Sequence, residues 1–244
     1  MATIIEKTRS LFAPPKTKDR LPAYMIAEIK EIIQLNARPV SPSTPLDELG
    51  FAVMDVETTG FNYKKGDEII AIGAVMIERS KIRKDKIFHQ LVYPNRQVPD
   101  QIHQLTGIQR EMLVGRPSFF GILQQFLQFI GGSVIVGHNV PFDLGFINSK
   151  LKKHCRTVIK NRTIDTITFS RSLHLPSKSF SLDNLLAFYN IEPMGRHSAI
   201  GDAYLTAELF IRLLTVLKGL HIDTLAGLDN LIRPYDRFED DKFF

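Results

Sequence analysis

Three strand-like segments follow one another in the first half of the chain, and helices alternate with short strands after them. The three segments are residues 51–56, 69–77 and 87–93. The later helices are expected at residues 119–130, 141–153, 182–189 and 199–217, and the short strands at 134–137 and 163–165. Strands that precede alternating helices and strands indicate an α/β domain built on a mixed sheet.

The chain has 244 residues, which suits one domain of about 150–200 residues with additional segments. Six of the 13 prolines lie in the first 45 residues, and such stretches favour extended backbone. Between them, residues 23–35 carry an apolar stripe with helical spacing. We therefore expect an N-terminal extension with one docking helix at 1–48, the α/β domain at 49–218, and a tail at 219–244.

Composition excludes several classes of protein. Cys155 is the only cysteine, so the chain has neither an internal disulfide nor a cysteine zinc cluster. No apolar run reaches the roughly 18 residues of a membrane helix, and the N-terminus lacks the apolar region of a signal peptide. We therefore expect a cytoplasmic protein without a membrane partner.

The formal net charge of +5 is compatible with a polyanionic partner but does not establish one. Basic residues gather at positions 79–86 and 150–162. Each of these clusters is either an ordinary solvated face or part of a nucleic-acid-binding surface, and the sequence leaves the two interpretations open.

Asp55 and Glu57 interrupt the end of the first apolar segment. Side chains two positions apart on a strand share one face, about 6.6 Å apart along it. Two nearby carboxylates without a counter-charge are costly to bury, and a bound cation removes that cost. A solvated strand end is the alternative interpretation of the pair.

Two further positions add to this acidic pattern. Asp143 lies where the strand at 134–137 gives way to a helix, and ligands of open α/β sheets bind at such strand ends. Asp202 lies near the start of the helix that Ser198 is expected to cap, and His197 lies in the loop before it. A loop histidine suits a mobile proton acceptor, and a helical carboxylate suits a fixed metal ligand. Taken alone, Asp143 could equally serve the helix dipole, and His197 could be an ordinary surface residue.

These motifs, taken in order, resemble those of the DEDD exonucleases of the histidine subtype. The matching segments are Asp55-Val56-Glu57-Thr58-Thr59-Gly60, His138-Asn139-x-x-Phe142-Asp143 and His197-x-x-x-x-Asp202. The segment from Val98 to Ile108 adds a likeness to the proofreading epsilon subunit of bacterial DNA polymerase III and its relatives. The resemblance covers residues 50–215 and excludes both ends of the chain.

The resemblance implies a ribonuclease H-like fold, with a five-stranded mixed sheet between helices. It also implies a 3′→5′ exonuclease that releases nucleoside 5′-monophosphates, in proofreading or repair. Two divalent ions, Mg²⁺ or Mn²⁺, would be held by Asp55, Glu57, Asp143 and Asp202. His197 would act as the general base.

The resemblance also implies how the substrate is held. The pocket for the terminal nucleotide would be formed by Thr58, Thr59, Gly60, Leu105 and Phe142. A core role for Phe142 is an equal alternative. Single-stranded DNA 3′ ends are the favoured partner, and a DNA polymerase or clamp is a further candidate.

Two rival functions remain. An exoribonuclease would share the fold and metals and would differ in contacts to the 2′-hydroxyl, which a sequence does not reveal. A non-catalytic nucleic-acid-binding module could also retain this fold. Retention of all four acids and the histidine favours an enzyme over that module.

Overall fold

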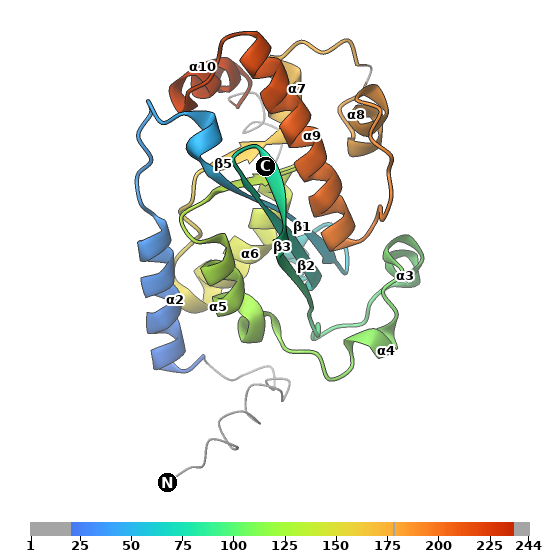
Figure 1. Cartoon of the computed structure of the whole chain (residues 1–244). Helices are drawn as coiled ribbons and strands as arrows, with labels where there is room; N and C mark the ends of the chain where they lie inside the picture. The colour runs from blue at the N-terminus through green and yellow to red at the C-terminus, as the bar shows by residue number, and fades with distance from the viewer. Residues whose placement is uncertain (1–20, 178, 237–244) are drawn as a thin grey trace.

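The computed structural model describes residues 21–177 and 179–236 (Figure 1). Its sheet has five strands in the order β3-β2-β1-β4-β5. They are β1 (Gly50–Thr58), β2 (Ile69–Glu78), β3 (Lys81–Leu91), β4 (Val134–Gly137) and β5 (Thr163–Asp165). The pairings within β3-β2-β1 are antiparallel, and those within β1-β4-β5 are parallel. The predicted five-stranded mixed sheet of the ribonuclease H-like type is therefore confirmed.

Helices cover both faces of this sheet. One face carries α2 (Ala23–Asn36), α5 (Phe119–Ile130) and α6 (Val140–Cys155). The other carries α7 (Thr166–Ser172), α8 (Leu182–Phe188), α9 (Ala199–Gly219) and α10 (Leu225–Asp236). In Figure 1, α2 and α5 lie on one side of the strands and α9 on the other.

The central strand β1 is buried on both faces. Its residues Phe51 and Val53 join the core beneath α9, whereas Ala52 and Met54 join the core beneath α5 and α6. Such double burial produces a continuous apolar run in the sequence. By the same alternation, the odd-numbered acids that follow Val53 lie on the α9 face of the sheet.

Helix α2 is an integral part of one core. Ile29 and Ile33 are buried against it, with exposed fractions of 0% and 2%. The side-chain amide of Asn36 donates a 2.7 Å hydrogen bond to the carbonyl of Leu127 at the end of α5. Helix α2 is therefore fixed to this core by both apolar and polar contacts.

The two segments that flank the domain bind each other. Pro45 forms an antiparallel bridge with Thr224. Leu46 donates a backbone hydrogen bond to Asp223 at 2.7 Å. Leu225 and Ala226 donate to residues 44 and 42 at 3.0 and 2.8 Å. We call this short ladder between residues 42–46 and 223–226 the clasp.

Three expectations need correction. Strand β3 begins at Lys81 rather than at residue 87, because charged residues at 81–86 pair across the hairpin instead of forming a loop. Residues 225–236, expected within a tail, form helix α10, in which Leu225, Leu228 and Ile232 are buried at helical spacing. The rest of the expected tail, from residue 237, lies outside the described residues.

The third correction concerns short helices that the sequence pattern did not reveal. They are η1 (Leu46–Glu48), η2 (Tyr63–Lys65), α3 (Asp100–Thr106), α4 (Arg110–Leu113) and α7. None exceeds two turns, so none carries a long apolar period. Across the described ranges, no helix combines the length and the hydropathy needed to span a membrane.

Candidate active site

Three carboxylates lie close together near the end of the central strand of the sheet. Asp55 and Glu57 lie at the end of β1, and Asp202 lies in the first turn of α9. Their ligand oxygens all lie within 4.8 Å of one another. The sheet and the helix thus bring together three of the four acids that the sequence singled out.

A glycine on β2 allows α9 to approach the acids. Gly73 pairs with Asp55 across the strands. A Cβ atom on Gly73 would lie only 2.3 Å from the carbonyl carbon of Ala199. The backbone at the start of α9 therefore occupies the space of a missing side chain, and this contact positions Asp202 beside Asp55.

Asp143 lies next to this group but is not one of its three members. It lies in the first turn of α6 with an exposed fraction of 2%. Its Oδ1 accepts a 3.0 Å hydrogen bond from the backbone N–H of Val56. Burial raises the pKa of Asp143, and the nearby charges of Asp165 and Glu57 add to the increase.

The pKa values of Asp55 and Glu57 are raised as well. Burial, followed by Asp143, Glu57 and Asp202, raises the pKa of Asp55 well above its usual range. Burial and then Asp202 raise the pKa of Glu57 to about 7. Clustered oxygen ligands that repel one another match the chemistry of a hard divalent cation. The acids therefore form a candidate divalent-metal site.

His197 lies at the mouth of this site in a strained loop. Its φ of 61° is in the left-handed region, which is uncommon for a residue other than glycine. Its backbone N–H faces both carboxylate oxygens of Asp202 at 3.3 Å. The imidazole itself is exposed. Asp202 therefore holds the loop, and the histidine side chain is left free to turn.

Arg196 is a member of the site that the sequence pattern did not identify. Its Nη1 lies 2.5 Å from Oδ2 of Asp202, and its Nε lies 2.6 Å from Oδ1 of Asp183 on α8. Burial opposes the charged form, but the two carboxylates more than offset it and raise the pKa of Arg196. The only feature of the sequence that could have pointed to Arg196 is its position directly before His197.

The loop after β1 is organised by Asp67. Its carboxylate accepts hydrogen bonds from the N–H of Asn62 at 2.9 Å and the hydroxyl of Thr59 at 3.4 Å. A Cβ atom on Gly60 would lie 2.5 Å from Asp67 Oδ2, so any side chain there would displace this carboxylate. Arg96 ion-pairs with the same carboxylate at 2.7 Å.

The two threonines expected at the nucleotide pocket are both buried, with exposed fractions of 7% and 1% for Thr58 and Thr59. The hydroxyl of Thr58 donates to the carbonyl of Gly60 at 2.6 Å. The hydroxyl of Thr59 accepts from the N–H of Glu68 at 3.0 Å. Their side chains shape the loop from within, so a ligand would meet mainly the backbone of this loop.

The two apolar side chains predicted to contact the substrate lie on different helices, α3 and α6. Leu105 is 46% exposed on α3, a helix that packs through Ile102 against the core containing Ala199. Phe142 is half-buried on α6, with its ring 6.3 Å from that of the exposed Phe61. Phe142 also contacts the core, so its expected core role is present.

His138 is partly buried beside the site. Its Nδ1 is 2.9 Å from the hydroxyl of Thr166. Burial, and then the charge of Arg196, lowers the pKa of His138 to about 4. A neutral, hydrogen-bonded ring suits an orienting and packing role beside the site.

This fold, with carboxylates clustered at the end of its central strand, defines a ribonuclease H-like α/β protein with a candidate metal site. Solved structures share the fold. Exonuclease X in complex with 5′ overhanging duplex DNA has a TM-score of 0.58 and 22% identity, and the match covers 75% of this chain and 99% of that one. The nuclease domain of 3′hExo, a DEDDh family member bound to rAMP, has a TM-score of 0.62 and 19% identity, over 71% and 95% of the two chains.

The chain belongs to the Exonuclease family, whose profile matches residues 52–210. It is 38% identical over 167 residues to DNA polymerase III subunit epsilon of Aquifex aeolicus, covering 68% of this chain and 81% of that protein. It is 34% identical over 209 residues to the PolC-type DNA polymerase III of Thermotoga maritima, covering 86% of this chain. The chain spans only 15% of the length of that polymerase.

Proposed function

We propose that the protein is a metal-dependent 3′→5′ exonuclease that shortens single-stranded DNA from its 3′ end and releases nucleoside 5′-monophosphates. The observation that carries the proposal is the cluster of Asp55, Glu57 and Asp202. Similarity to an epsilon subunit over most of that subunit's length supports DNA as the substrate. Proofreading or repair is the proposed context.

Two divalent ions, Mg²⁺ or Mn²⁺, are proposed as the cofactors. Asp55, Glu57, Asp143 and Asp202 would hold them, since carboxylate oxygens suit these hard cations better than zinc. When bound, such ions supply Lewis acidity to an attacking water and to the departing oxygen in an in-line displacement at phosphorus. Four carboxylates also match the charge of two divalent ions.

His197 is the proposed general base. In its neutral form the imidazole accepts a proton from the attacking water, and its exposure leaves room for the ring to reach that water. The backbone link to Asp202 keeps the base beside the acids during the reaction. Arg196 fixes the orientation of the Asp202 carboxylate from the other side.

The terminal nucleotide is proposed to lie over the loop formed by Thr58, Thr59 and Gly60. The missing side chain of Gly60 makes room for the Asp67 carboxylate, which holds the backbone of this loop in place. Leu105 and Phe142 would contact the base from α3 and α6. Apolar and aromatic contacts of this kind tolerate any base sequence.

The remaining parts of the proposal concern the whole protein. The exonuclease domain is assigned to residues 49–218, with the N-terminal extension at 1–48 and the C-terminal segment at 219–244 attached to it. A cytoplasmic location is proposed, with a DNA polymerase or clamp as a partner, in keeping with the names of the similar proteins.

One gel tests the activity. The protein is incubated with 5′-labelled single-stranded DNA or RNA of the same sequence, in Mg²⁺, Mn²⁺ or EDTA, beside an Asp55→Ala variant. We expect a metal-dependent ladder that shortens from the 3′ end, faster on DNA, and a loss of more than about 100-fold in the variant. Faster cleavage of RNA would identify an exoribonuclease. Absence of cleavage with either metal would favour a binding module.

A further inference from the structure

A groove runs along the outer face of α6, away from the sheet. It has a volume of about 680 Å³. Its lining residues on α6 recur at helical spacing from Pro141 to Lys152, a length of about 16 Å. Tyr63 and Lys64 of η2 form the opposite wall. The groove is therefore an elongated channel between one helix and one turn.

Gly145 allows Tyr63 of η2 to pack closely against α6 at the floor of this groove. A Cβ atom on Gly145 would lie 2.7 Å from the ring of Tyr63. That ring in turn packs edge-on against Phe146, with the ring centroids 5.5 Å apart. The close contact between η2 and α6 therefore depends on the absence of a side chain at this position.

Three lysines give the walls of the groove a positive charge. Lys64, Lys152 and Lys153 line it and are exposed, and no Asp or Glu is among the lining residues. Within residues 21–177 and 179–236, none of the three lysines forms an ion pair. Exposed cations that form no ion pair with the protein can bind the phosphates of a nucleic-acid backbone.

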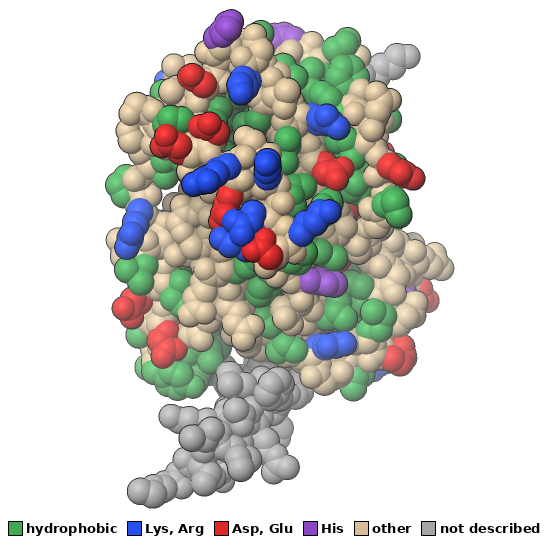
Figure 2. Space-filling view, viewed as in Figure 1, with side chains coloured by type: hydrophobic (Ala, Val, Ile, Leu, Met, Phe, Trp, Pro, Cys, Tyr) green, Lys and Arg blue, Asp and Glu red, His purple; other side chains and the backbone are tan. Residues whose placement is uncertain are grey.

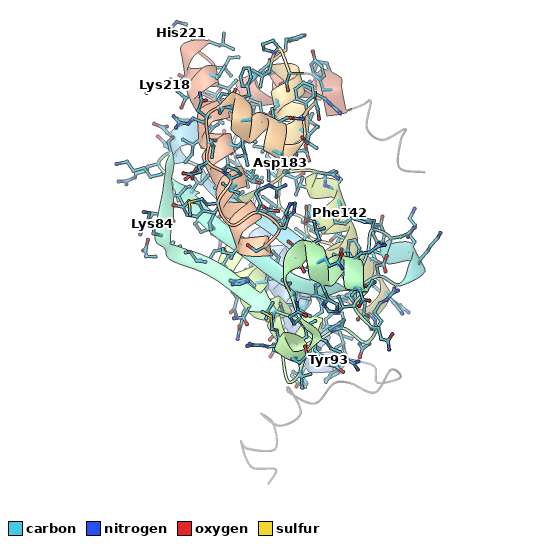
Figure 3. The ribbon with its side chains drawn as sticks, turned by 90° about the vertical axis from the view of Figure 1, so that its right-hand side faces the viewer. Lys84, Tyr93, Phe142, Asp183, Lys218 and His221 are labelled. Carbon is cyan, nitrogen blue, oxygen red and sulfur yellow. The ribbon has the colours of Figure 1, made fainter. Side chains whose placement is uncertain are left out.

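The other basic cluster differs in this respect. On the β2–β3 hairpin, Glu78 pairs with both Arg83 and Lys86, and Arg83 also pairs with Asp85. Figure 2 shows basic and acidic side chains intermixed over this hairpin. Phe142 of the α6 side and Lys84 of the hairpin lie on opposite sides of the view in Figure 3. The charge of the hairpin is largely compensated, and it lies far from the α6 groove.

One end of the groove lies at the start of α6, the helix whose first turn also carries Asp143. Pro141 lines the groove, Asp143 joins the acids, and Phe142 lies between them on the first turn of α6. The rings of Phe61 and Phe142 are 6.3 Å apart, and those of Phe142 and Phe146 are 5.1 Å apart. Phe146 is buried in the core, so Phe61 and Phe142 are the rings of this group that a strand could contact between the acids and the groove.

We propose that this groove holds the nucleotides upstream of the 3′ end, so that single-stranded DNA passes over Phe142 and Phe61 and then along α6. The inference rests on the proposed exonuclease function and adds the path of the strand to it. Lys64, Lys152 and Lys153 contact phosphates, and Phe61 stacks on a base. Contacts of both kinds are independent of sequence, as removal of successive nucleotides requires.

The test compares two triple variants. Lys64→Ala/Lys152→Ala/Lys153→Ala removes the charge of the groove. Lys81→Ala/Lys84→Ala/Lys218→Ala removes the same charge from exposed positions outside it. Binding of 5′-fluorescein oligo(dT) of about 12 nucleotides, a length within the range of single-strand sites, is measured by anisotropy in EDTA at several salt concentrations. Hydrolysis of p-nitrophenyl thymidine 5′-monophosphate in Mn²⁺ measures the active site without an upstream strand.

We expect the groove variant to bind the oligonucleotide roughly tenfold more weakly at low salt, with a log–log salt slope shallower by about 2. The control variant keeps the slope of the parent, and both variants hydrolyse the small ester at the parental rate. An unchanged slope in the groove variant, or an equal loss in the control, overturns the proposal. Failure of the parent to hydrolyse the ester or DNA would instead refute the proposed function, and the binding comparison would still decide the groove.

Discussion

Arg196 ion-pairs with Asp202 across 2.5 Å, although Asp202 is one of the three carboxylates that form the candidate metal site. The same guanidinium ion-pairs with Asp183 of α8. One cation therefore offsets part of the negative charge of the site and ties α8 to the start of α9. Because His197 follows it directly, the pair also fixes the loop that carries the proposed base.

Replacing this cation should make the protein more dependent on metal. Arg196→Met leaves Asp183 and Asp202 without their partner, so we expect a stability loss of up to about 3 kcal/mol in EDTA. Mn²⁺ should restore more stability in the variant than in the parent, since it supplies the missing positive charge. Thermal unfolding with and without Mn²⁺ measures both effects.

Arg83→Met is the matched control for that experiment. Arg83 also pairs with two acids, but its side chain is 39% exposed and lies on the hairpin. Exposed pairs contribute about 0–1 kcal/mol, and the stabilisation by Mn²⁺ should equal that of the parent. If Mn²⁺ stabilised the Arg196 variant no more than this control, the compensating role of Arg196 would be wrong.

The contact between Gly73 and α9 predicts a strong effect of one methyl group. Gly73→Ala places a Cβ atom against the backbone of Ala199 and Ile200, so the start of α9 must shift. We expect destabilisation of about 1–3 kcal/mol and a marked loss of hydrolysis, because Asp202 moves with the helix. Denaturant unfolding and the DNA ladder assay measure the two effects.

Gly219→Ala tests the same change at the other end of α9. A Cβ atom there has nothing within 4 Å, and alanine favours helix by up to about 1 kcal/mol. This variant should be as active as the parent and equally or more stable. Equal activity of the two alanine variants would show that the close contact at Gly73 does not position Asp202.

His138 predicts a specific acid sensitivity. Its pKa falls from 6.5 to about 4 on burial, so the unfolded chain binds a proton more readily than the folded one. The neutral His138 ring therefore makes its full contribution to the free energy of unfolding above about pH 6.5. This contribution, about 3 kcal/mol in all, is lost as the pH falls toward about 4. His138→Asn should flatten the stability profile across that interval. Parallel profiles for parent and variant would exclude this role of His138.

Asn36 tests whether the N-terminal extension is structural. Asn36→Ala removes one of two hydrogen bonds that the carbonyl of Leu127 accepts, since the N–H of Gly131 also donates to it at 3.1 Å. The change should cost about 0.5–1.5 kcal/mol, without changing the hydrolysis rate per folded molecule. Gln34→Ala removes an exposed bond to Lys160 and should change stability by less than about 0.5 kcal/mol. If both variants were equally stable, the hydrogen bond between α2 and α5 would not contribute to the stability of the protein.

The sequence predicted the parts of the structure that repeat a pattern. The apolar run of β1 indicated a buried strand. The alternation of side chains along that strand placed Asp55 and Glu57 on one face. Helix α10 was missed although Leu225, Leu228 and Ile232 have helical spacing, because the acidic and aromatic residues after them suggested a solvated end.

Other features depend on contacts between distant segments, which no local pattern contains. The pairing of Arg196 with Asp183 arises only when α8 lies beside α9. The burial of Thr59 depends on Asp67 and Glu68, which lie across the turn. The groove on α6 exists because Tyr63 of another element packs against Gly145.

The clasp has a consequence for the order of folding. It pairs Pro45 with Thr224, so its hydrogen bonds close a loop that contains the whole sheet. Closing so long a loop is entropically costly until the intervening chain is compact. During synthesis, residues 42–46 must also wait until residue 226 has left the ribosome. The clasp is therefore expected to be the last backbone ladder to form and among the first to open when the protein unfolds.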